Sequence, residues 1–252
     1  MLTPDHLVAV LGVTALAGLI QGVAGFGSAL VAVPLLALML PLDTVVPLMV
    51  LISMAVSLLN LLHLHHAVRF APLFPLLFGY VLGTPVGLLL LTRAPEALVM
   101  GLLGLSIAVY AGFSLAGRQP NARWLRQQRV AIGALSGALG AAFSTNGPPV
   151  ILHVSAHAEW GADRQKAALT LFFLISGGLT ALAQWGSGLI TARVIGLLPW
   201  CLPPLLLGAL GGVWLYRRLG AHDYRRLVFI LVLAAGLLLV GRSLSAGLRA
   251  AG

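Results

Sequence analysis

Long runs without a charged side chain occupy most of this chain. The first extends from Leu7 to Leu42 and contains no Asp, Glu, Lys or Arg. Seven more runs of the same kind follow, at 44–68, 70–92, 97–117, 130–158, 167–192, 194–216 and 227–241. Since a helix needs roughly 20 apolar residues to cross a bilayer, this pattern predicts an all-α membrane protein with many crossings.

Two of these runs are interrupted by small and polar residues. The interruption of the first run is the glycine-rich stretch Gln21–Ser28, and that of the run 130–158 is Ser144–Pro149. A helix break at membrane depth exposes backbone N–H and C=O groups that lipid cannot satisfy. We therefore expect both breaks to be buried in protein or to line a polar cavity, as in transporters built from discontinuous helices.

The order of the runs indicates an internal repeat. Each half of the chain has one broken segment, 7–40 or 130–158, followed by three plain helices. These helices are expected at 44–62, 71–91 and 96–116, and again at 167–186, 195–216 and 225–241. An offset of 115 residues places Gly18, Gly22, Gly25 and Pro34 on Gly133, Gly137, Gly140 and Pro149. We expect a first repeat over 1–116, a cytoplasmic linker over 117–129 and a second repeat over 130–252, within one membrane domain.

The positive charges predict how the repeats cross the membrane. If each broken segment is a hairpin that enters and leaves on one side, four loops lie on the inner side. These loops, 63–70, 117–129, 157–166 and 217–226, hold 11 of the 15 Lys and Arg residues. Cytoplasmic loops carry an excess of Lys and Arg, whereas single spans would leave no bias, so the hairpin arrangement is favoured. A hairpin plus three spans inverts the second half relative to the first, which is a recurring transporter architecture.

Composition narrows the range of functions. Hydrophobic residues make up 60% of the chain and charged residues 8%, which leaves almost nothing for a soluble domain. The formal net charge of +9 comes from Arg in short loops, and we interpret it as a topology signal rather than a nucleic-acid surface. The single Cys201 forms no internal disulfide, and the cluster His63, His65 and His66 lacks a convincing fourth ligand. We therefore expect neither a metal site nor a cofactor.

The two breaks are the candidate substrate site. The first contains Gly25, Phe26, Gly27 and Ser28, and the second contains Ser144, Thr145, Asn146 and Gly147. Ser, Thr and Asn suit N-cap positions and proline suits the first turn, so a helix is expected to begin after each break. Its unpaired N–H groups and the positive end of its dipole would attract a small anion. The alternative is that these residues only break or pack helices.

Polar side chains on two plain helices extend the candidate site. Ser53, Ser57 and Asn60 share one helical face, and Ser176, Thr180 and Gln184 share a face of the equivalent helix in the second half. Asn60 and Gln184 are expected near helix ends, in an interfacial role. Gln21, Ser57 and Thr180 are candidate substrate contacts, against the alternative of hydrogen bonds between or within helices.

His153 is the candidate for proton coupling. It follows the second break, forms an i, i+4 pair with His157, and belongs to the residue type that titrates near neutral pH. A buried structural histidine is the alternative. The acidic residues Asp43, Glu96, Glu159, Asp163 and Asp223 all lie at the ends of the apolar runs. This position argues against a proton relay of carboxylates within the membrane.

Three stretches resemble a known family. Gly25–Leu36, with the sequence GFGSALVAVPLL, resembles the first signature of the TauE/SafE sulfite exporter family, also called the toluene sulfonate uptake permease family. Asn146–Leu152 resembles its second-half counterpart, and Gly83–Gly87 resembles the glycine-spaced helix between them. The resemblance covers nearly the whole chain and implies a bacterial inner-membrane carrier, often for sulfite, sulfonates or related organosulfur anions. Some branches have three glycines in the first signature, where this chain has Gly25-Phe26-Gly27.

These observations predict a secondary transporter, and an exporter, of small anions. It would work by alternating access around the two facing breaks, with the lipid bilayer and the anion as partners, no nucleic acid, and a homodimer left open. Two alternatives are an importer of another carboxylate or oxyanion and a membrane scaffold. A third is an intramembrane enzyme that uses Ser28 or Ser144 with His153. We do not expect an enzyme, because the chain has no Gly-x-Ser-x-Gly nucleophile motif.

Overall fold

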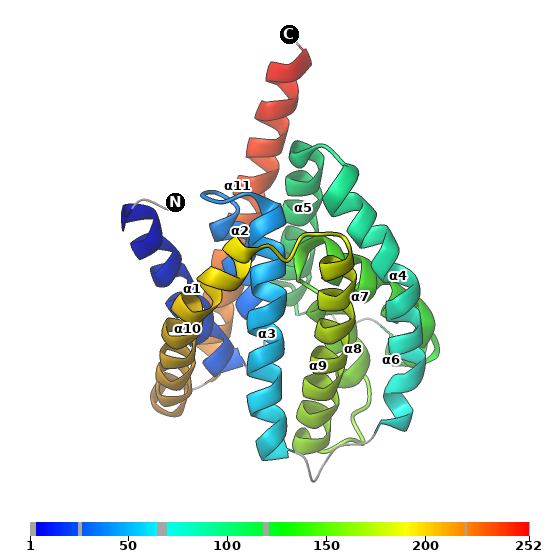
Figure 1. Cartoon of the computed structure of the whole chain (residues 1–252). Helices are drawn as coiled ribbons and strands as arrows, with labels where there is room; N and C mark the ends of the chain where they lie inside the picture. The colour runs from blue at the N-terminus through cyan, green and yellow to red at the C-terminus, as the bar shows by residue number, and fades with distance from the viewer. Residues whose placement is uncertain (1–3, 25–26, 65–69, 118–120, 220, 252) are drawn as a thin grey trace. The chain divides into compact units, whose positions relative to one another are not determined.

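The computed structural model of this chain is built from helices (Figure 1). It describes residues 4–24, 27–64, 70–117, 121–219 and 221–251, and within these ranges no strand occurs. The helices before the linker are α1 (Pro4–Ala24), α2 (Ser28–Leu36), α3 (Leu42–Leu64), the 3₁₀ turn η2 (Ala71–Leu73), α4 (Phe74–Arg93) and α5 (Glu96–Leu115). The others are α6 (Ala122–Gln127), α7 (Arg129–Phe143), α8 (Gly147–Ser155), α9 (Ala162–Gly186), α10 (Ala192–Leu219) and α11 (Ala221–Ala251).

The helices predicted from the sequence are confirmed. Among the described residues, five helices are long and apolar enough to cross a membrane: Leu42–Leu62, Ala71–Arg93, Glu96–Leu115, Asp163–Gly186 and Ala192–Leu215. Shorter apolar stretches lie at Leu7–Gly22, Arg129–Phe143 and Val232–Ser245. The sequence did not predict α6, a short helix inside the linker that begins where the Asn121 side chain accepts a hydrogen bond from the Arg123 N–H. The last helix is also longer than the expected 225–241.

The chain divides into two compact units, and each takes helices from both halves of the sequence. Unit 1 consists of Met1–Val45, Arg93–Arg118 and Ile195–Gly252, and unit 2 of Val46–Thr92 and Gln119–Val194. The broken segment formed by α1 and α2 therefore belongs to unit 1, and the one formed by α7 and α8 belongs to unit 2.

Glycines allow the helices of unit 1 to pack closely. A Cβ at Gly18 or Gly22 of α1 would overlap the backbone of Leu205 or Ala209 in α10. A Cβ at Gly208 of α10 would in turn overlap the carbonyl of Ala15. In the same unit α2 is almost entirely buried and packs against α1 and α11. Small residues at four-residue spacing are the usual way for membrane helices to approach one another.

Unit 2 repeats this packing between α4 and α7. A Cβ at Gly83 or Gly87 of α4 would overlap the carbonyl oxygen of Ala134 or Ala138 in α7. One hydrophobic core joins α4, α6, α7, α8 and α9, with the buried side chains Leu73, Leu76, Leu77, Tyr80, Leu125, Ile132, Val150, Val154, Ala156, Trp160, Ala168 and Phe172. The short helix α8 lies in this core and packs against α6, α7 and α9.

The two broken segments agree in their helix boundaries and contacts when they are aligned at an offset of 119 residues, rather than 115. At 119 residues, Ala24 at the end of α1 falls on Phe143 at the end of α7, and α2 falls on α8. Gly18, which faces Leu205, then corresponds to Gly137, which faces Tyr80. An alignment based on the glycines alone gives an offset that is too small by about one helical turn. The reason is that glycines with four-residue spacing can be matched again after a shift of four residues.

Candidate functional site

The first break ends in a backbone conformation that favours glycine. Gly27 is the N-cap residue of α2 and has φ 97° and ψ 8°, in the left-handed region. Ser28 is the first residue of α2 and is buried, so it does not act as the N-cap that its residue type suggested. No side chain caps this helix start. Since the first N–H groups of a helix have no partner inside it, the start of α2 presents main-chain donors. Gly25 and Phe26 lie outside the described residues.

Gln21 lies in α1, one turn before the first break. Its side-chain oxygen Oε1 is buried and has no hydrogen-bond partner among the residues that the structure describes. Buried polar atoms almost always have a partner, protein or water. Gln21 is therefore a polar group in unit 1 that a ligand or a water would satisfy.

The second break begins at a serine, rather than a glycine, with a left-handed backbone conformation. Ser144 has φ 55° and ψ 20° and ends α7, and its N–H donates to the carbonyl oxygen of Gly140 at 2.8 Å. Ser144 and Thr145 are both buried. Asn146 occupies the N-cap position of α8, but its side chain does not cap the helix. Its Nδ2 instead donates to Ser176 Oγ in α9 at 2.9 Å, so the expected cap is replaced by a bridge between helices.

The two helix starts are not equivalent as anion sites. Pro148 and Pro149 follow Gly147 in the first turn of α8, and proline has no N–H. Of the main-chain N–H groups at the start of α8, only those of Asn146 and Gly147 remain as donors. The start of α2, in contrast, keeps the N–H groups of Ser28 and the two residues after it. The second break must therefore rely on side chains for most of its hydrogen-bond donors.

Polar side chains from α4, α8 and α9 gather around the second break. Ser176, Thr180 and Gln184 are all fully buried along one face of α9. The Tyr80 hydroxyl of α4 lies 2.7 Å from Thr180 Oγ1, and Gln184 Nε2 donates to the Ala141 carbonyl oxygen at 3.4 Å. Gln184 lies near the end of α9, as predicted, but its side chain is 0% exposed, and its Oε1 has no hydrogen-bond partner among the described residues.

The structure brings together some of the predicted site residues and separates others. Asn146 and Thr180 belong to the polar cluster at the second break. Ser57 is buried in α3 of the same unit, while Asn60 on the same face is exposed. Tyr80 is not among the residues predicted from the sequence, because a single tyrosine in an apolar run cannot be distinguished from the other hydrophobic residues.

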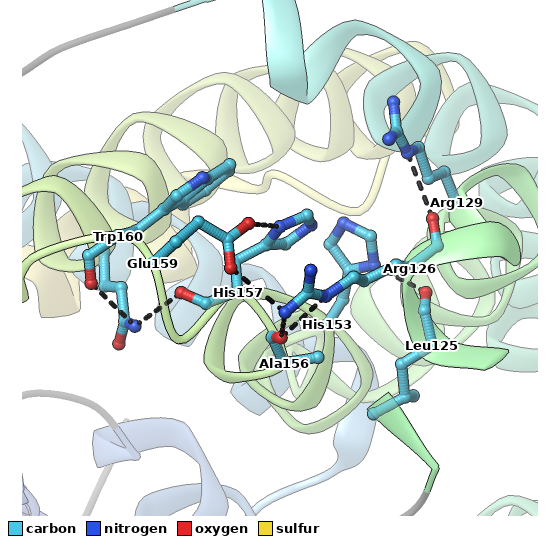
Figure 2. A network of polar contacts seen from close by, with 9 residues as sticks. Leu125, Arg126, Arg129, His153, Ala156, His157, Glu159 and Trp160 are labelled. Atoms are coloured by element: carbon cyan, nitrogen blue, oxygen red, sulfur yellow. Dashed lines mark hydrogen bonds and ion pairs between the residues drawn. The ribbon is translucent and has the colours of Figure 1, made fainter. Parts of the chain in front are cut away.

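His153 and the loop after α8 form a polar network with the linker (Figure 2). His153 is buried, and its Nδ1 lies 2.8 Å from the Leu125 carbonyl oxygen, so Nδ1 carries the proton that is donated. The ring of His153 contacts that of His157, whose Nδ1 bonds Glu159 Oε1 at 2.9 Å. His153 lies outside the five candidate spans, and its burial, the largest effect, lowers its pKa. The hydrogen bond from His157 lowers the pKa of the exposed Glu159 carboxyl.

Arg126 of α6 joins this network to the end of α8. Its Nε donates to the carbonyl oxygen of Ala156, the C-cap residue of α8, at 2.8 Å, and its Nη2 donates to the same oxygen (Figure 2). Nη2 also bonds Glu159 Oε2 at 3.0 Å. A cation at a helix C-terminus is favourable, because it satisfies the last carbonyl groups and complements the helix dipole. The linker thus holds the far end of the helix that begins at the second break.

Comparison with known proteins identifies the family. The family model described as sulfite exporter TauE/SafE matches residues 10–239, nearly the whole chain. The chain belongs to the TauE/SafE sulfite exporter family. No curated protein and no solved structure matches it. The match covers both breaks and confirms the family that the sequence predicted.

Membership of the TauE/SafE family makes the chain a multi-pass membrane transporter with a small anionic substrate, not an enzyme. In the described part of the chain, no three His, Cys, Asp or Glu side chains are grouped to hold a metal ion. His65 and His66 of the histidine cluster lie outside that part.

Proposed function

We propose that this TauE/SafE protein is a secondary carrier of the bacterial inner membrane that exports small sulfur oxyanions, sulfite or sulfonates. The anion is held by the helix starts at the two breaks, and the carrier works by alternating access. The observation that carries the proposal is that both broken segments have the same construction. In each, a nine-residue helix, α2 or α8, begins inside an apolar run immediately after a break.

The chemistry of the breaks supports an anionic substrate. Helix starts provide hydrogen-bond donors and a partial positive charge, each favourable contact being worth about 0.3–2 kcal/mol. Neither break contains a Lys or Arg, so the anion is not held by a fixed cation. Moderate binding of this kind suits a carrier, which must release its substrate as well as capture it. Gln21, Gly27, Ser28, Ser144, Thr145, Asn146, Gly147 and Thr180 are the described residues that we assign to binding, with Ser57 as a further candidate.

Flux of sulfite through the purified protein in proteoliposomes tests this proposal. We expect sodium sulfite to cross faster than in empty liposomes, and Gly27→Val and Gly147→Val each to lower the flux per folded molecule about tenfold or more. Valine at Gly27 opposes the left-handed backbone, and at Gly147 its Cβ would lie 3.3 Å from Ile151 Cδ1 and 3.7 Å from Phe173 Cζ.

Gly241→Val is the matched control for both variants. Gly241 lies in α11, where an added Cβ meets nothing within 4 Å, so sulfite flux should stay close to that of the unmodified protein. Folding is checked by monodispersity in detergent. If both break variants fold and transport sulfite normally, the anion does not bind at the breaks.

A further inference from the structure

We propose that the Tyr80 hydroxyl is a specificity-determining group of the second break, which donates a hydrogen bond to an oxygen of the transported oxyanion. This inference rests on the proposed anion transport and names a residue that belongs to neither broken segment. Tyr80 lies in α4, in the same compact unit as α7, α8 and α9.

The direction of the Tyr80 side chain is fixed by its packing. The residue is 1% exposed, and its ring contacts the Phe172 ring edge to face, with centroids 5.7 Å apart and an angle of 84°. Its backbone lies against α7 at Gly137, where a Cβ would overlap the Tyr80 carbonyl oxygen. A phenol held in this way gives a hydrogen bond of defined direction with little ordering cost.

The hydroxyl itself lies beside the second break. A Cβ added at Gly140, in the last turn of α7, would overlap the Tyr80 hydroxyl oxygen and would lie 3.0 Å from Asn146 Cβ. Asn146 in turn donates to Ser176 Oγ at 2.9 Å. The hydroxyl is thus placed between the end of α7 and the start of α8, where the main chain changes direction.

The second break needs a neutral donor at this place. Pro148 and Pro149 remove two main-chain donors from the start of α8, and the stretch Ser144–Pro149 contains no Lys or Arg. A phenol supplies a donor without adding a charge. Donors of fixed direction also discriminate between ligands, since only an anion with a well-placed acceptor gains the hydrogen bond.

The pair formed by Tyr80 and Thr180 allows this donor to change partner at low cost. The two hydroxyl oxygens are 2.7 Å apart, and either can donate to the other. Each hydroxyl has one proton and two lone pairs. When Tyr80 donates to a substrate oxygen, Thr180 rotates its proton toward the Tyr80 oxygen, and both hydroxyls remain bonded. Without substrate, Tyr80 donates to Thr180, and the hydroxyl is still satisfied.

Kinetics of sulfite transport in proteoliposomes distinguish this role from a purely structural one. We expect Tyr80→Phe to raise the KM for sodium sulfite roughly tenfold or more while the maximal rate changes little, because a donor to a charged group is lost. Tyr110→Phe is the matched control, because it makes the same change at a buried tyrosine of α5 that is not assigned to binding, and its KM should stay within about twofold of the unmodified value.

Three results would overturn the assignment. A folded Tyr80→Phe protein with an unchanged KM would show that the hydroxyl does not contact sulfite, and an equal rise in Tyr110→Phe would show that the loss of any buried phenol hydroxyl has this effect. If Tyr80→Phe does not fold, the double variant Tyr80→Phe/Thr180→Val, which leaves no unpaired hydroxyl, is judged by the same criterion. Absence of sulfite flux in the unmodified protein would overturn the proposed function, and this assignment with it.

Discussion

At the scale of single residues, His153 shows how burial sets the charge of a side chain. The Leu125 carbonyl oxygen accepts the Nδ1 proton, and the surroundings are too dry to favour a second proton on the ring. The neighbouring His157, Arg129 and Arg126 also disfavour a positive charge on His153. The pKa of His153 is therefore lowered, although the hydrogen bond to Leu125 acts in the opposite direction, within a network that joins α8 to the linker.

The lowered pKa of His153 predicts a loss of stability in acid. The folded pKa of His153 lies below its unfolded value, so the unfolded chain takes up the proton first as the pH falls. The contribution of His153 to stability is thus complete above about pH 6.5 and decreases as the pH falls through the interval down to the folded pKa. His153→Asn keeps an N–H donor but does not titrate. We expect its melting temperature to change less between about pH 7 and pH 5 than that of the unmodified protein.

Thermal unfolding in detergent at several pH values measures this effect, with the unmodified protein as the reference for the other histidines. Equal pH slopes in both proteins would mean that His153 does not change its protonation on unfolding. The proton coupling assigned to His153 from the sequence makes a separate prediction, because the pH dependence of sulfite flux should then also change in His153→Asn.

At the scale of elements, α8 is a short helix held at both ends. Its first residue follows the bridge from Asn146 to Ser176, and its C-cap carbonyl at Ala156 accepts two hydrogen bonds from Arg126. A nine-residue helix is too short to be stable alone, so these contacts and the core around Val150 and Val154 determine its position. The geometry of the second break thus depends on the linker as well as on the break itself.

Loss of the Arg126 side chain should loosen α8. We expect Arg126→Gln to lower the free energy of unfolding by about 1 kcal/mol. The effect is no larger because the Arg126 side chain is 39% exposed and water screens its charge. Arg126→Lys should fall between, since it keeps the charge but not the two directed N–H groups. Arg123→Gln, at an exposed position of the same helix α6, is the control and should change little. Equal melting temperatures for the Arg126→Gln and Arg123→Gln proteins would contradict this role.

At the scale of the whole molecule, the distribution of positive charge predicts the orientation in the membrane. With each broken segment as a hairpin, 11 of the 15 Lys and Arg residues lie on the inner side, which places the linker inside and both termini outside. Single cysteines introduced at Asn121 and Ala251, in a Cys201→Ala background, should then react with an impermeant thiol reagent from opposite sides. Labelling of both positions from the same side would exclude the hairpin arrangement and the inverted repeat that follows from it.

The hydrophobic pattern by itself determined the helices and the two breaks. Runs without charge predicted α3, α4, α5, α9 and α10 and the two broken segments, because the cost of placing charges and unpaired backbone in lipid is large and local. The short signatures at the breaks were also enough to indicate the family, which the match over residues 10–239 confirmed. Both kinds of information are carried by neighbouring residues, and so they can be read without the fold.

Only the tertiary structure decided which helices meet and which polar groups share a site. The assembly of each unit from both halves of the chain and the one-turn correction of the repeat depend on long-range contacts such as Gly18 with Leu205. The same is true of Tyr80 and Thr180, which are 100 residues apart in the chain, and of the buried position of Gln184. A helix pattern with four-residue spacing fits its partner equally well after a shift of one turn, and the particular packing of the neighbouring helices selects one register.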